Sequence, residues 1–402
     1  MSKIEYTSVE GKSLGYFALL GGLGFIMLVA LLCAWYMEHN GHHVTGMTNQ
    51  IVWGAPHVFA IFLIVSASGA LNVASIASVF RKKIYEPMAR LSALLALALL
   101  TGGLVVLLLD LGRPDRLIVA MTYYNFKSIF AWNIILYSGF FAFVGAYLWT
   151  MMDHSVYKFK PYAGFFAFVW RLILTTGTGS IFGFLVARSA YDAAILAPMF
   201  IIMSFSFGLA IFLLVLMAAY KWNNMPLGDV VLNRLRNLLG VFVAAVLYFT
   251  AVYHLTNLYE TQHHGVEKFI LLDGGLYTNI FWLGEILIGG LIPLAMIYAP
   301  GLKNNRGSLG LICTMVIIGG FAKIYTLLIG GQAYPMEVFP GYDVSSSFYD
   351  GVVNTYTPSL PEIALGLGGV AMTLFIVVFA LKVLRFLPVS LADSVADPHS
   401  AK

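Results

Sequence analysis

About ten long apolar stretches run through the sequence, and these constrain its fold more than any other feature. A helix needs about 20 apolar residues to cross a hydrocarbon core about 30 Å thick. Only 10% of the 402 residues are charged, whereas a soluble protein carries roughly 25% because its surface faces water. The sequence therefore predicts an all-α integral membrane protein, with residues 1–402 forming a single polytopic domain. The predicted spans are 15–37, 51–80, 89–109, 128–152, 164–187, 194–220, 237–259, 278–299, 309–333 and 359–384.

Lysine and arginine residues predict the orientation of these spans. Basic connections, such as the one with Arg81, Lys82 and Lys83, alternate along the sequence with connections that hold few basic residues. Cytoplasmic loops of membrane proteins carry the excess of Lys and Arg, so we expect the basic set and both termini to face the cytoplasm. The predicted organisation, in the cytoplasmic membrane, is a cytoplasmic N-terminus at 1–14, a transmembrane region at 15–384 and a cytoplasmic tail at 385–402.

The longest extracytoplasmic connection is predicted at 334–358. It is rich in aromatic and acidic residues and contains neither Lys nor Arg. One interpretation is an ordinary solvated loop. The other is a docking surface for an extracytoplasmic partner, because a segment this apolar is unusual for a free linker.

The sequence shows no pattern for a redox centre of its own. Its two cysteines, Cys33 and Cys313, both lie in apolar stretches, and no CxxC, CxxCH or ferredoxin-type spacing occurs. We therefore expect no metal site, no iron–sulfur cluster and no haem. The net charge of +4 is too small to indicate nucleic-acid binding.

Ionisable residues in the spans are the strongest candidates for a functional site, because each costs several kcal/mol in lipid unless it is paired or hydrated. Four of them share one depth near the outer face, namely His57, His254, Glu285 and Lys323; Asp110 caps the outer end of the third span, and Arg171 lies nearer the inner end of the fifth. The shared depth predicts an outer-leaflet site for the polar headgroup of a ligand. Two simpler interpretations stay open. Glu285 and Lys323 could form a structural ion pair, and either histidine could be hydrogen-bonded to a backbone carbonyl.

Two polar stripes run along the second and fifth spans. Side chains 11 and 18 positions apart return to nearly the same helix face at about 100° per residue, and this is the spacing of His57, Ser68 and Ser75. The stripes are predicted as a proton path, and the alternative is that small polar side chains serve helix packing. The path residues are Ser68, Asn72 and Ser75 in the second span and Arg171, Thr175 and Thr178 in the fifth.

The segment LLLDLGRPDRLIVAMTYYNFKSIFAWN (107–133) is the most specific motif in the sequence. Gly112 and Pro114 predict a turn directly after the third span, which would bring Asp110 and Arg113 close enough to pair. Aromatic rings beside a fixed carboxylate and guanidinium suit a planar headgroup that carries two carbonyl or hydroxyl oxygens. The alternative is an interfacial aromatic belt around a salt-bridged turn. The polar and aromatic residues that follow are Tyr123, Tyr124, Trp132 and Asn133.

The Asp-Leu-Gly-Arg-Pro sequence at 110–114 resembles the signature of the NrfD/PsrC family, the membrane subunits of polysulfide reductase and related respiratory complexes. The pair Trp53 and Gly54, which opens the second span, and the number of spans fit the same family. Within the family, the length and the stretch 49–72 are most similar to DsrP, the integral membrane subunit of the DsrMKJOP complex of sulfur metabolism.

The resemblance implies an architecture and a function. The implied fold has two four-helix bundles, spans 2–5 and spans 6–9, flanked by spans 1 and 10. The implied function is exchange of electrons between the quinone pool, menaquinone or ubiquinone, and an extracytoplasmic iron–sulfur subunit like DsrO, and it can include proton translocation. The other implied partners are a cytochrome c like DsrJ, a cytochrome b like DsrM and a cytoplasmic subunit like DsrK. Such a protein is one part of an oxidoreductase complex and is not expected to be active alone.

Three catalytic residues are expected to move protons in this implied reaction: His57, Asp110 and Glu285. A histidine suits this role because its unperturbed pKa of about 6.5 lets it take up and release a proton near neutral pH. The resemblance supports Asp110, Arg113 and His57 as site residues, whereas the residues of spans seven to nine rest on their shared depth. The residues expected to bind the quinone are His57, Trp53, Asp110, Arg113, Tyr123, Trp132, Asn133, His254 and Lys323.

Two other functions stay open on the sequence alone. His57 and His254 could be the axial ligands of one haem b between facing helices, which would make the protein a membrane cytochrome. Glu285 and Lys323 could be the coupling site of an ion-coupled transporter, although the spans show no inverted repeat with broken helices at the midplane.

Overall fold

The computed structural model describes residues 4–336, 339, 342 and 351–396. Within these residues, ten helices or continuous helical runs are long and apolar enough to cross a membrane. The prediction of an all-α membrane protein with ten spans is therefore confirmed. The runs are Leu14–Asn40, Ala55–Ser78, Lys83–Leu109, Ile129–Met152, Tyr157–Gly183, Leu196–Trp222, Asp229–Tyr259, Leu276–Tyr298, Arg306–Ala333 and Leu360–Val383.

In seven spans a single α-helix forms all or most of the run, with a short 3-10 segment before it in the third and fifth, and three spans are built from two or three consecutive helical segments. The single helices are α1 (Leu14–Asn40), α4 (Ala89–Leu109), α6 (Ile129–Met152), α7 (Lys160–Gly183), α8 (Leu196–Trp222), α9 (Asp229–Tyr259) and α15 (Leu360–Val383). The second span joins α2 (Ala55–Ala70) to α3 (Asn72–Ser78). The eighth joins α11 (Leu276–Asn279), the π-helix η7 (Ile280–Leu291) and α12 (Ile292–Tyr298), and the ninth joins α13 (Arg306–Tyr325), the π-helix η9 (Thr326–Gly330) and α14 (Gly331–Ala333).

Short helices occupy the connections between the spans. They are α5 (Leu117–Thr122), α10 (His264–Lys268), the π-helical η6 (Phe269–Asp273) and, after the last span, α16 (Asp393–Ala396). Single 3-10 segments lie at His42–Val44, Lys83–Met88, Pro114–Arg116, Tyr157–Phe159, Thr261–His263 and Pro300–Leu302.

The seventh span begins at Asp229, whereas the sequence predicts its start at 237. The prediction places the polar first turns of the helix outside the span. In the structure the buried Arg236 lies in those turns and donates hydrogen bonds to backbone carbonyls, including Met296 O (3.2 Å) and Lys303 O (2.5 Å). A guanidinium that serves the free carbonyls at a helix end is stabilising, so the helix continues beyond its apolar stretch.

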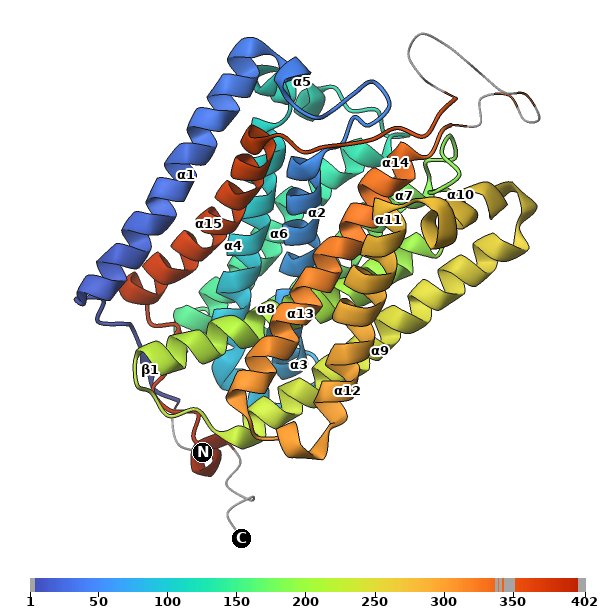
Figure 1. Ribbon diagram of the computed structural model, residues 1–402. Coiled ribbons are helices and arrows are strands. Elements are labelled where there is room, and N and C mark those ends of the chain that lie inside the picture. The colour runs from blue at the N-terminus through green and yellow to red at the C-terminus, as the bar shows by residue number, and fades with distance from the viewer. Residues whose placement is uncertain (1–3, 337–338, 340–341, 343–350, 397–402) are drawn as a thin grey trace.

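The spans pack as two neighbouring groups with a flanking pair (Figure 1). The first group is α2, α4, α6 and α7, the second is α8, α9 and spans eight and nine, and the flanking pair is α1 on α15, which itself packs on α4 and α2. Helix α8 joins the groups, because it contacts α2 and α7 as well as α9 and α13. This is the predicted arrangement of spans 2–5 and 6–9, with spans 1 and 10 beside them.

Glycines allow the closest helix contacts. Gly69 of α2 and Gly208 of α8 lie so near each other that a methyl group on either would overlap the backbone of the opposite helix. Gly289 and Gly319 stand in the same relation between η7 and α13. Small residues let helices approach closely in membranes, where packing rather than the hydrophobic effect drives their association. These contacts therefore fix α8 against α2 and η7 against α13.

We expect Gly208→Ala to lower the stability of the protein by about 1–3 kcal/mol, because an overpacked helix contact must shift its backbone. The measurement is the thermal unfolding midpoint of the purified complex. Gly145→Ala in α6 is the matched control, since nothing lies within 4 Å of a methyl group at that position. Equal midpoints for the two variants would contradict the close contact between α2 and α8.

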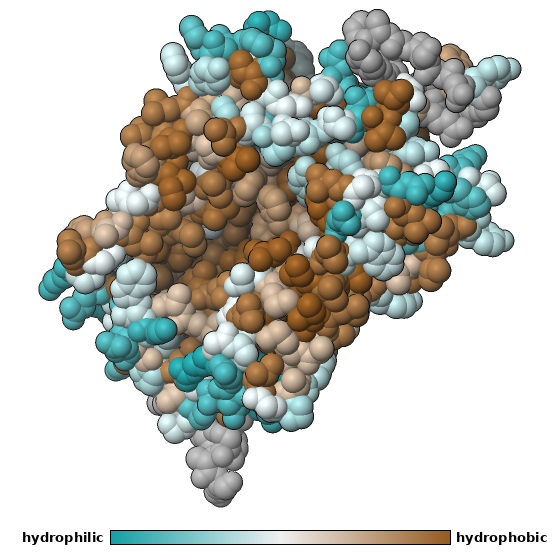
Figure 2. All heavy atoms as spheres, viewed as in Figure 1, coloured by the Kyte–Doolittle hydropathy of each residue, from teal (hydrophilic) through white to brown (hydrophobic). Residues whose placement is uncertain are grey.

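Both ends of the described polypeptide lie at the same end of the helix bundle (Figure 1). There β1 (Tyr6–Thr7) and β2 (Leu387–Pro388) form a short antiparallel pair, with Tyr6 opposite Pro388. An even number of spans requires this arrangement. Figure 2 shows a broad hydrophobic band between two hydrophilic ends, as a membrane protein requires. That the end with the termini faces the cytoplasm stays a prediction.

The two ends of the long outer connection predicted at 334–358 lie next to each other at the helix bundle. The N–H of Asn354 donates to Ala333 O (2.9 Å), and the Asn354 side chain donates to Gln50 Oε1 (2.6 Å). The docking role expected for this loop falls largely on residues 337–338, 340–341 and 343–350, which lie outside the described residues.

Candidate functional site

His57 and Asp110 meet at the ends of two adjacent spans. His57 lies in the first turn of α2, and Asp110 caps the C-terminal end of α4. His57 Nδ1 is 2.9 Å from Asp110 Oδ2; the Asp110 side chain is 1% exposed and that of His57 is 21% exposed. Histidine is the side chain that most often serves as a general acid or base. We call this pair the His57–Asp110 dyad.

The dyad has free hydrogen-bonding capacity. The two groups are close enough for an ion pair, but the angle between them is not that of a hydrogen bond, and neither Asp110 oxygen has a donor among the described residues. A buried polar atom left without a partner costs about 1–3 kcal/mol, and more when it is charged. A hydroxyl group supplied by a ligand would remove that cost.

The indole of Trp53 lies beside the imidazole of His57. The Trp53 ring lies 6.4 Å from the His57 ring, and it also contacts Phe130 of α6 and Phe182 of α7, each at 6.0 Å between ring centroids. The Phe182 ring meets Trp53 edge-on, with 85° between the ring planes, and the Phe130 ring is tilted by 55°, so the flat apolar face beside His57 is the indole of Trp53 alone. The dyad and Trp53 together thus offer a polar edge and a flat face to a planar ligand.

The turn after Asp110 carries Arg113 away from the dyad. Gly112 adopts a φ of 68°, in the left-handed region that glycine tolerates, and Arg113 is exposed. Among the described residues no ion pair joins Arg113 to Asp110, so the expected pair is not formed. His57 occupies the place beside the carboxylate that the sequence prediction gives to Arg113.

The other residues expected around the ring lie at the surface or bond to their own helices. Tyr123 is 83% exposed, and the exposed Trp132 donates from Nε1 to Phe126 O (3.0 Å). The buried Asn133 donates to Ile129 O (2.9 Å), four residues before it in the sequence. Within the described part of the protein, no hydrogen bond or ring contact joins these three side chains to the dyad. Tyr123 and Trp132 instead belong to the exposed aromatic and apolar surface of α5 and the start of α6, whereas Asn133 is buried against α7.

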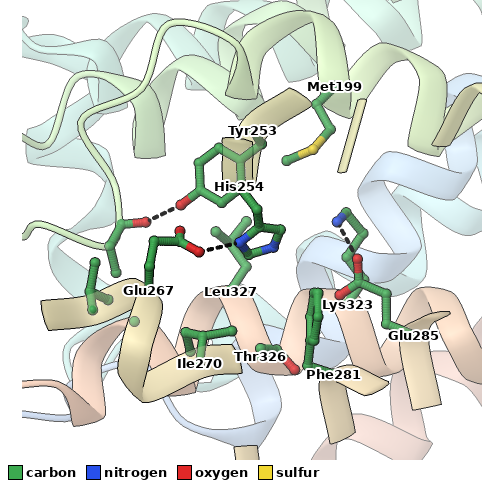
Figure 3. A pocket seen from close by; sticks show the side chains of 13 residues that line it. Met199, Tyr253, His254, Glu267, Ile270, Phe281, Glu285, Lys323, Thr326 and Leu327 are labelled. Carbon is green, nitrogen blue, oxygen red and sulfur yellow. Dashed lines mark hydrogen bonds and ion pairs between the residues drawn. The ribbon is translucent and has the colours of Figure 1, made fainter. Parts of the chain in front are cut away.

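A second dyad lies in the other group of helices (Figure 3). His254 of α9 places Nδ1 2.7 Å from Glu267 Oε2, and Asn257 donates to Glu267 Oε1 (2.8 Å). Glu267 belongs to α10, which folds back against the spans, so that its side chain is only 2% exposed. We call this pair the His254–Glu267 dyad.

A buried ion pair lies close to the second dyad. Lys323 Nζ of α13 is 2.5 Å from Glu285 Oε1 of η7, and it also donates to Thr250 Oγ1 of α9 (2.8 Å). Thr250 in turn donates to Glu285 Oε1 (3.3 Å). Both charged side chains are 6% exposed. The pairing of Glu285 with Lys323 that the sequence allowed is present, and Thr250 completes it.

Two small cavities lie on either side of this ion pair. One, of about 40 Å³, is lined by both residues of the His254–Glu267 dyad as well as by Glu285 and Lys323 (Figure 3). The other, of about 20 Å³, is lined by Glu285 and Lys323 and by residues farther along the same helices, among them Val243. A cavity of this size that is lined by polar groups can hold a water molecule. Neither can hold a quinone ring.

Both charged residues of the ion pair lie in or next to π-helical turns. Glu285 is inside η7, and Lys323 lies just before η9. A π-helical turn contains one extra residue, and such turns are frequent at functional sites. The backbone irregularity and the buried charges therefore coincide.

The residues expected to form one headgroup site therefore form two clusters. His57, Asp110 and Trp53 lie in the first group of helices, and His254, Glu285 and Lys323 lie in the second. Helix α8 packs on both groups, and α2 of the first group also contacts α13 of the second. Residues at one depth can still point in different directions around the bundle, and hydropathy carries no information about that direction. The two histidines that a haem b would need do not face each other among the described residues. His57 faces Asp110, and His254 faces Glu267.

The two polar stripes meet at the contact between α2 and α7. Arg171 donates from Nη1 to Ser68 O (2.9 Å) and Asn72 Oδ1 (2.7 Å), and Thr175 donates to Ser68 Oγ (2.7 Å). These bonds support the helix-packing interpretation of Ser68, Asn72, Arg171 and Thr175, while a proton path through them stays a prediction. Of the other two path residues, Thr178 donates to Leu174 O (3.0 Å), and the buried Ser75 Oγ has no described partner.

Sequence reasoning missed three residues of the second cluster. Thr250 lies four residues before His254 and thus on the same face of α9, a spacing that could have revealed it. Asn257 lies three residues after His254 in the same way. The sequence places Glu267 in an outer connection, where a solvated loop residue is the simplest expectation, and no local signal shows that α10 turns back to bury it.

The fold and these buried pairs define a polytopic membrane protein with titratable groups enclosed among its spans. The model of the family "Polysulphide reductase, NrfD" matches residues 43–336. The protein therefore belongs to the NrfD family, as the resemblance predicted. Its place in the DsrP branch stays a prediction.

Three relatives show how far the similarity extends. The "Hdr-like menaquinol oxidoreductase integral membrane subunit" of Archaeoglobus fulgidus is 28% identical over 98% of this sequence and 99% of its own length. The C component of the selenate reductase of Mesobacillus selenatarsenatis is 25% identical over 88% of this sequence and 91% of its own length. The C component of the polysulfide reductase of Wolinella succinogenes is 25% identical over 71% of this sequence and 96% of its own length.

Proposed function

We propose that this protein is the quinone-interacting membrane subunit of a redox complex, and that the His57–Asp110 dyad is where protons leave or join the quinone ring. The proposal rests mainly on the buried Asp110 carboxylate, which lies against a histidine and has no hydrogen-bond donor among the described residues. The relatives support the proposal, because one is named as a menaquinol oxidoreductase subunit and another as a component of polysulfide reductase.

The residues of the site fit the chemistry of a quinone. A quinol carries two hydroxyl groups on a flat ring and supplies two electrons and two protons when it is oxidised. The indole of Trp53 offers the ring a flat apolar contact, and the dyad offers one hydroxyl an acceptor. His57 would take up the proton from that hydroxyl, and the Asp110 carboxylate at 2.9 Å would stabilise the positive charge on the imidazole.

We propose that the electron partner is an extracytoplasmic iron–sulfur subunit, like DsrO, docked over the outer ends of α2 and α4. The dyad supports this position because it lies at those ends, opposite the end that holds both termini. In this proposal the membrane is the cytoplasmic one, the termini face the cytoplasm, and the quinone is menaquinone or ubiquinone. Partners like DsrJ, DsrM and DsrK would follow if the protein is the DsrP subunit of a sulfur-metabolism complex.

We further propose that the second cluster handles protons that cross the membrane. The Glu285–Lys323 pair supports this role because it separates two water-sized cavities, and the outer cavity is shared with the His254–Glu267 dyad. A carboxylate and an amine in contact can exchange a proton with waters on either side. The same pair was the basis of the transporter hypothesis, and membership of the NrfD family favours proton handling inside a redox complex.

The test of the quinone site is binding of a fluorescent hydroxyquinoline N-oxide, a quinol analogue, to the purified complex. We expect His57→Ala to raise its Kd by about tenfold or more, because the variant loses a hydrogen bond to a chargeable group. His264→Ala is the control, since that histidine is exposed and its ring bonds to Leu258 O. Wild-type affinity in His57→Ala would reject the dyad as the quinone site.

A further inference from the structure

Gln332 connects the second group of helices to the segment that carries Trp53. It lies in α14, at the outer end of the ninth span, and is 1% exposed. Its Oε1 atom accepts hydrogen bonds from the N–H groups of Val52 (3.0 Å) and Trp53 (3.1 Å). Its Nε2 atom donates to the carbonyl oxygens of Trp53 (3.0 Å) and Leu328 (2.9 Å). A side-chain amide group can make four hydrogen bonds, and Gln332 makes all four.

The segment that Gln332 holds has no regular structure of its own. It immediately precedes α2, whose N-cap residue Gly54 provides no side-chain hydrogen bond. In the first turn of α2, the backbone N–H of Ala55 donates to the Tyr356 hydroxyl (2.6 Å). That hydroxyl donates to Glu362 Oε1 (2.7 Å). Burial raises the pKa of Tyr356, so its hydroxyl stays protonated. Side chains from distant parts of the sequence therefore fix the backbone conformation of the segment that leads into α2.

Arg188 braces the same contact from the connection between spans five and six. Its Nη1 atom donates to Gln332 O (3.0 Å), and its Nη2 atom donates to Gln50 O (2.7 Å). Hydrogen bonds from a charged donor are stronger than neutral ones. The guanidinium thus fixes the distance between α14 and the segment before α2. The Gln332 amide then fixes the backbone of Trp53 relative to α14.

We propose that Gln332 is a positioning residue for the quinone site: it holds the backbone of Trp53 so that the indole stands against the His57 ring. This inference rests on the proposed function. The two rings are 6.4 Å apart and tilted by 30°, and Gln332 bonds both the N–H and the C=O of Trp53. Without these bonds the indole can shift, which weakens binding of the quinone ring and leaves the chemical step at the dyad nearly unchanged. Gln332 thereby links the span that carries Lys323 to the dyad in the other group.

The test combines Gln332→Met with Trp53→Phe in the intact complex. Methionine has nearly the length of glutamine and removes all four hydrogen bonds. We expect Gln332→Met to raise the Kd of the hydroxyquinoline N-oxide, and the KM for quinol, by about tenfold while kcat changes by less than about threefold. If Gln332 acts through Trp53, the double variant will bind the analogue as weakly as Trp53→Phe alone. Thr373→Val, which removes the bond from Thr373 to Ala98 O (3.2 Å) far from the dyad, is the control and should bind normally.

The possible results separate this inference from the proposed function. Additive effects of the Gln332 and Trp53 changes, or wild-type affinity in Gln332→Met, would overturn the positioning role. If the methionine variant does not assemble, Gln332→Glu is the second variant, because its carboxylate keeps the acceptor for the N–H groups of Val52 and Trp53. We expect it to bind the analogue about threefold more weakly than the wild type, and we expect this difference to disappear when Trp53 is already phenylalanine. Unchanged binding in Gln332→Glu would overturn the positioning role. Should His57→Ala also bind normally, the proposed function itself fails.

Discussion

Asp110→Asn is expected to slow electron exchange with quinol by about a hundredfold or more, because general acid–base catalysis contributes about 10²–10⁴-fold. Asparagine keeps the shape of the side chain but removes the negative charge that lies 2.9 Å from His57 Nδ1. It also places an N–H donor where a quinol hydroxyl would donate. The measurement is the steady-state rate of the intact complex with a soluble quinol, followed by the absorbance of the quinone.

The matched control for this prediction is Asp115→Asn. Asp115 lies five residues after Asp110 in the same motif, but it is exposed and has no ion-pair partner among the described residues. We expect the Asp115 variant to turn over at the wild-type rate. An Asp110 variant that also turned over normally would show that the carboxylate has no part in the reaction.

Lys323→Met is expected to destabilise the protein by about 3–5 kcal/mol, because it leaves the Glu285 carboxylate buried without its counter-charge. The pair is 2.5 Å apart and each side chain is 6% exposed, so the carboxylate would lose its counter-charge in a place that bulk water does not reach. The measurement is the thermal unfolding midpoint of the purified complex. Lys160→Met is the control: Lys160 is also 2.5 Å from a glutamate, Glu86, but that glutamate is 33% exposed, and we expect a loss of at most about 1 kcal/mol.

Removing both charges should separate stability from proton handling. The double variant Lys323→Met with Glu285→Gln leaves no unpaired charge, so we expect most of the stability to return. In liposomes that contain the complex, we expect it to keep electron transfer and to lose proton translocation. A single Lys323 variant as stable as the wild type would show that the pair contributes nothing, and an unchanged ratio of protons to electrons in the double variant would reject the proton role.

The spans could be predicted because they follow from the composition of the sequence, whereas their grouping was implied by the resemblance to the NrfD family. Lipid requires long apolar helices, and each of the ten stretches found in the sequence became one of them. The largest error, at the start of α9, arose where Arg236 bonds to carbonyls that belong to the end of the eighth span and its connection to the ninth. A partner that far away in the sequence leaves no mark on the local hydropathy.

The candidate site was harder to predict than the spans. Hydropathy and charge identified His57, Asp110, His254, Glu285 and Lys323 as residues that lipid does not favour, and all five are now seen in close polar pairs. Which residue pairs with which depends on the rotation of each helix about its axis. That rotation is set by contacts such as Gly69 on Gly208 and by the fold-back of α10, and a single sequence does not encode either in a readable pattern.

The hydrogen bond from the Asn354 N–H to Ala333 O has a consequence for how this protein can vary. Because the two edges of the outer connection are tied to each other, the distance between them is independent of how many residues lie in between. Lengthening a surface excursion with joined edges costs little free energy, since closure entropy grows only with the logarithm of its length. A different number of residues between these two positions would therefore leave the separation of the edges, and the helices that carry them, unchanged.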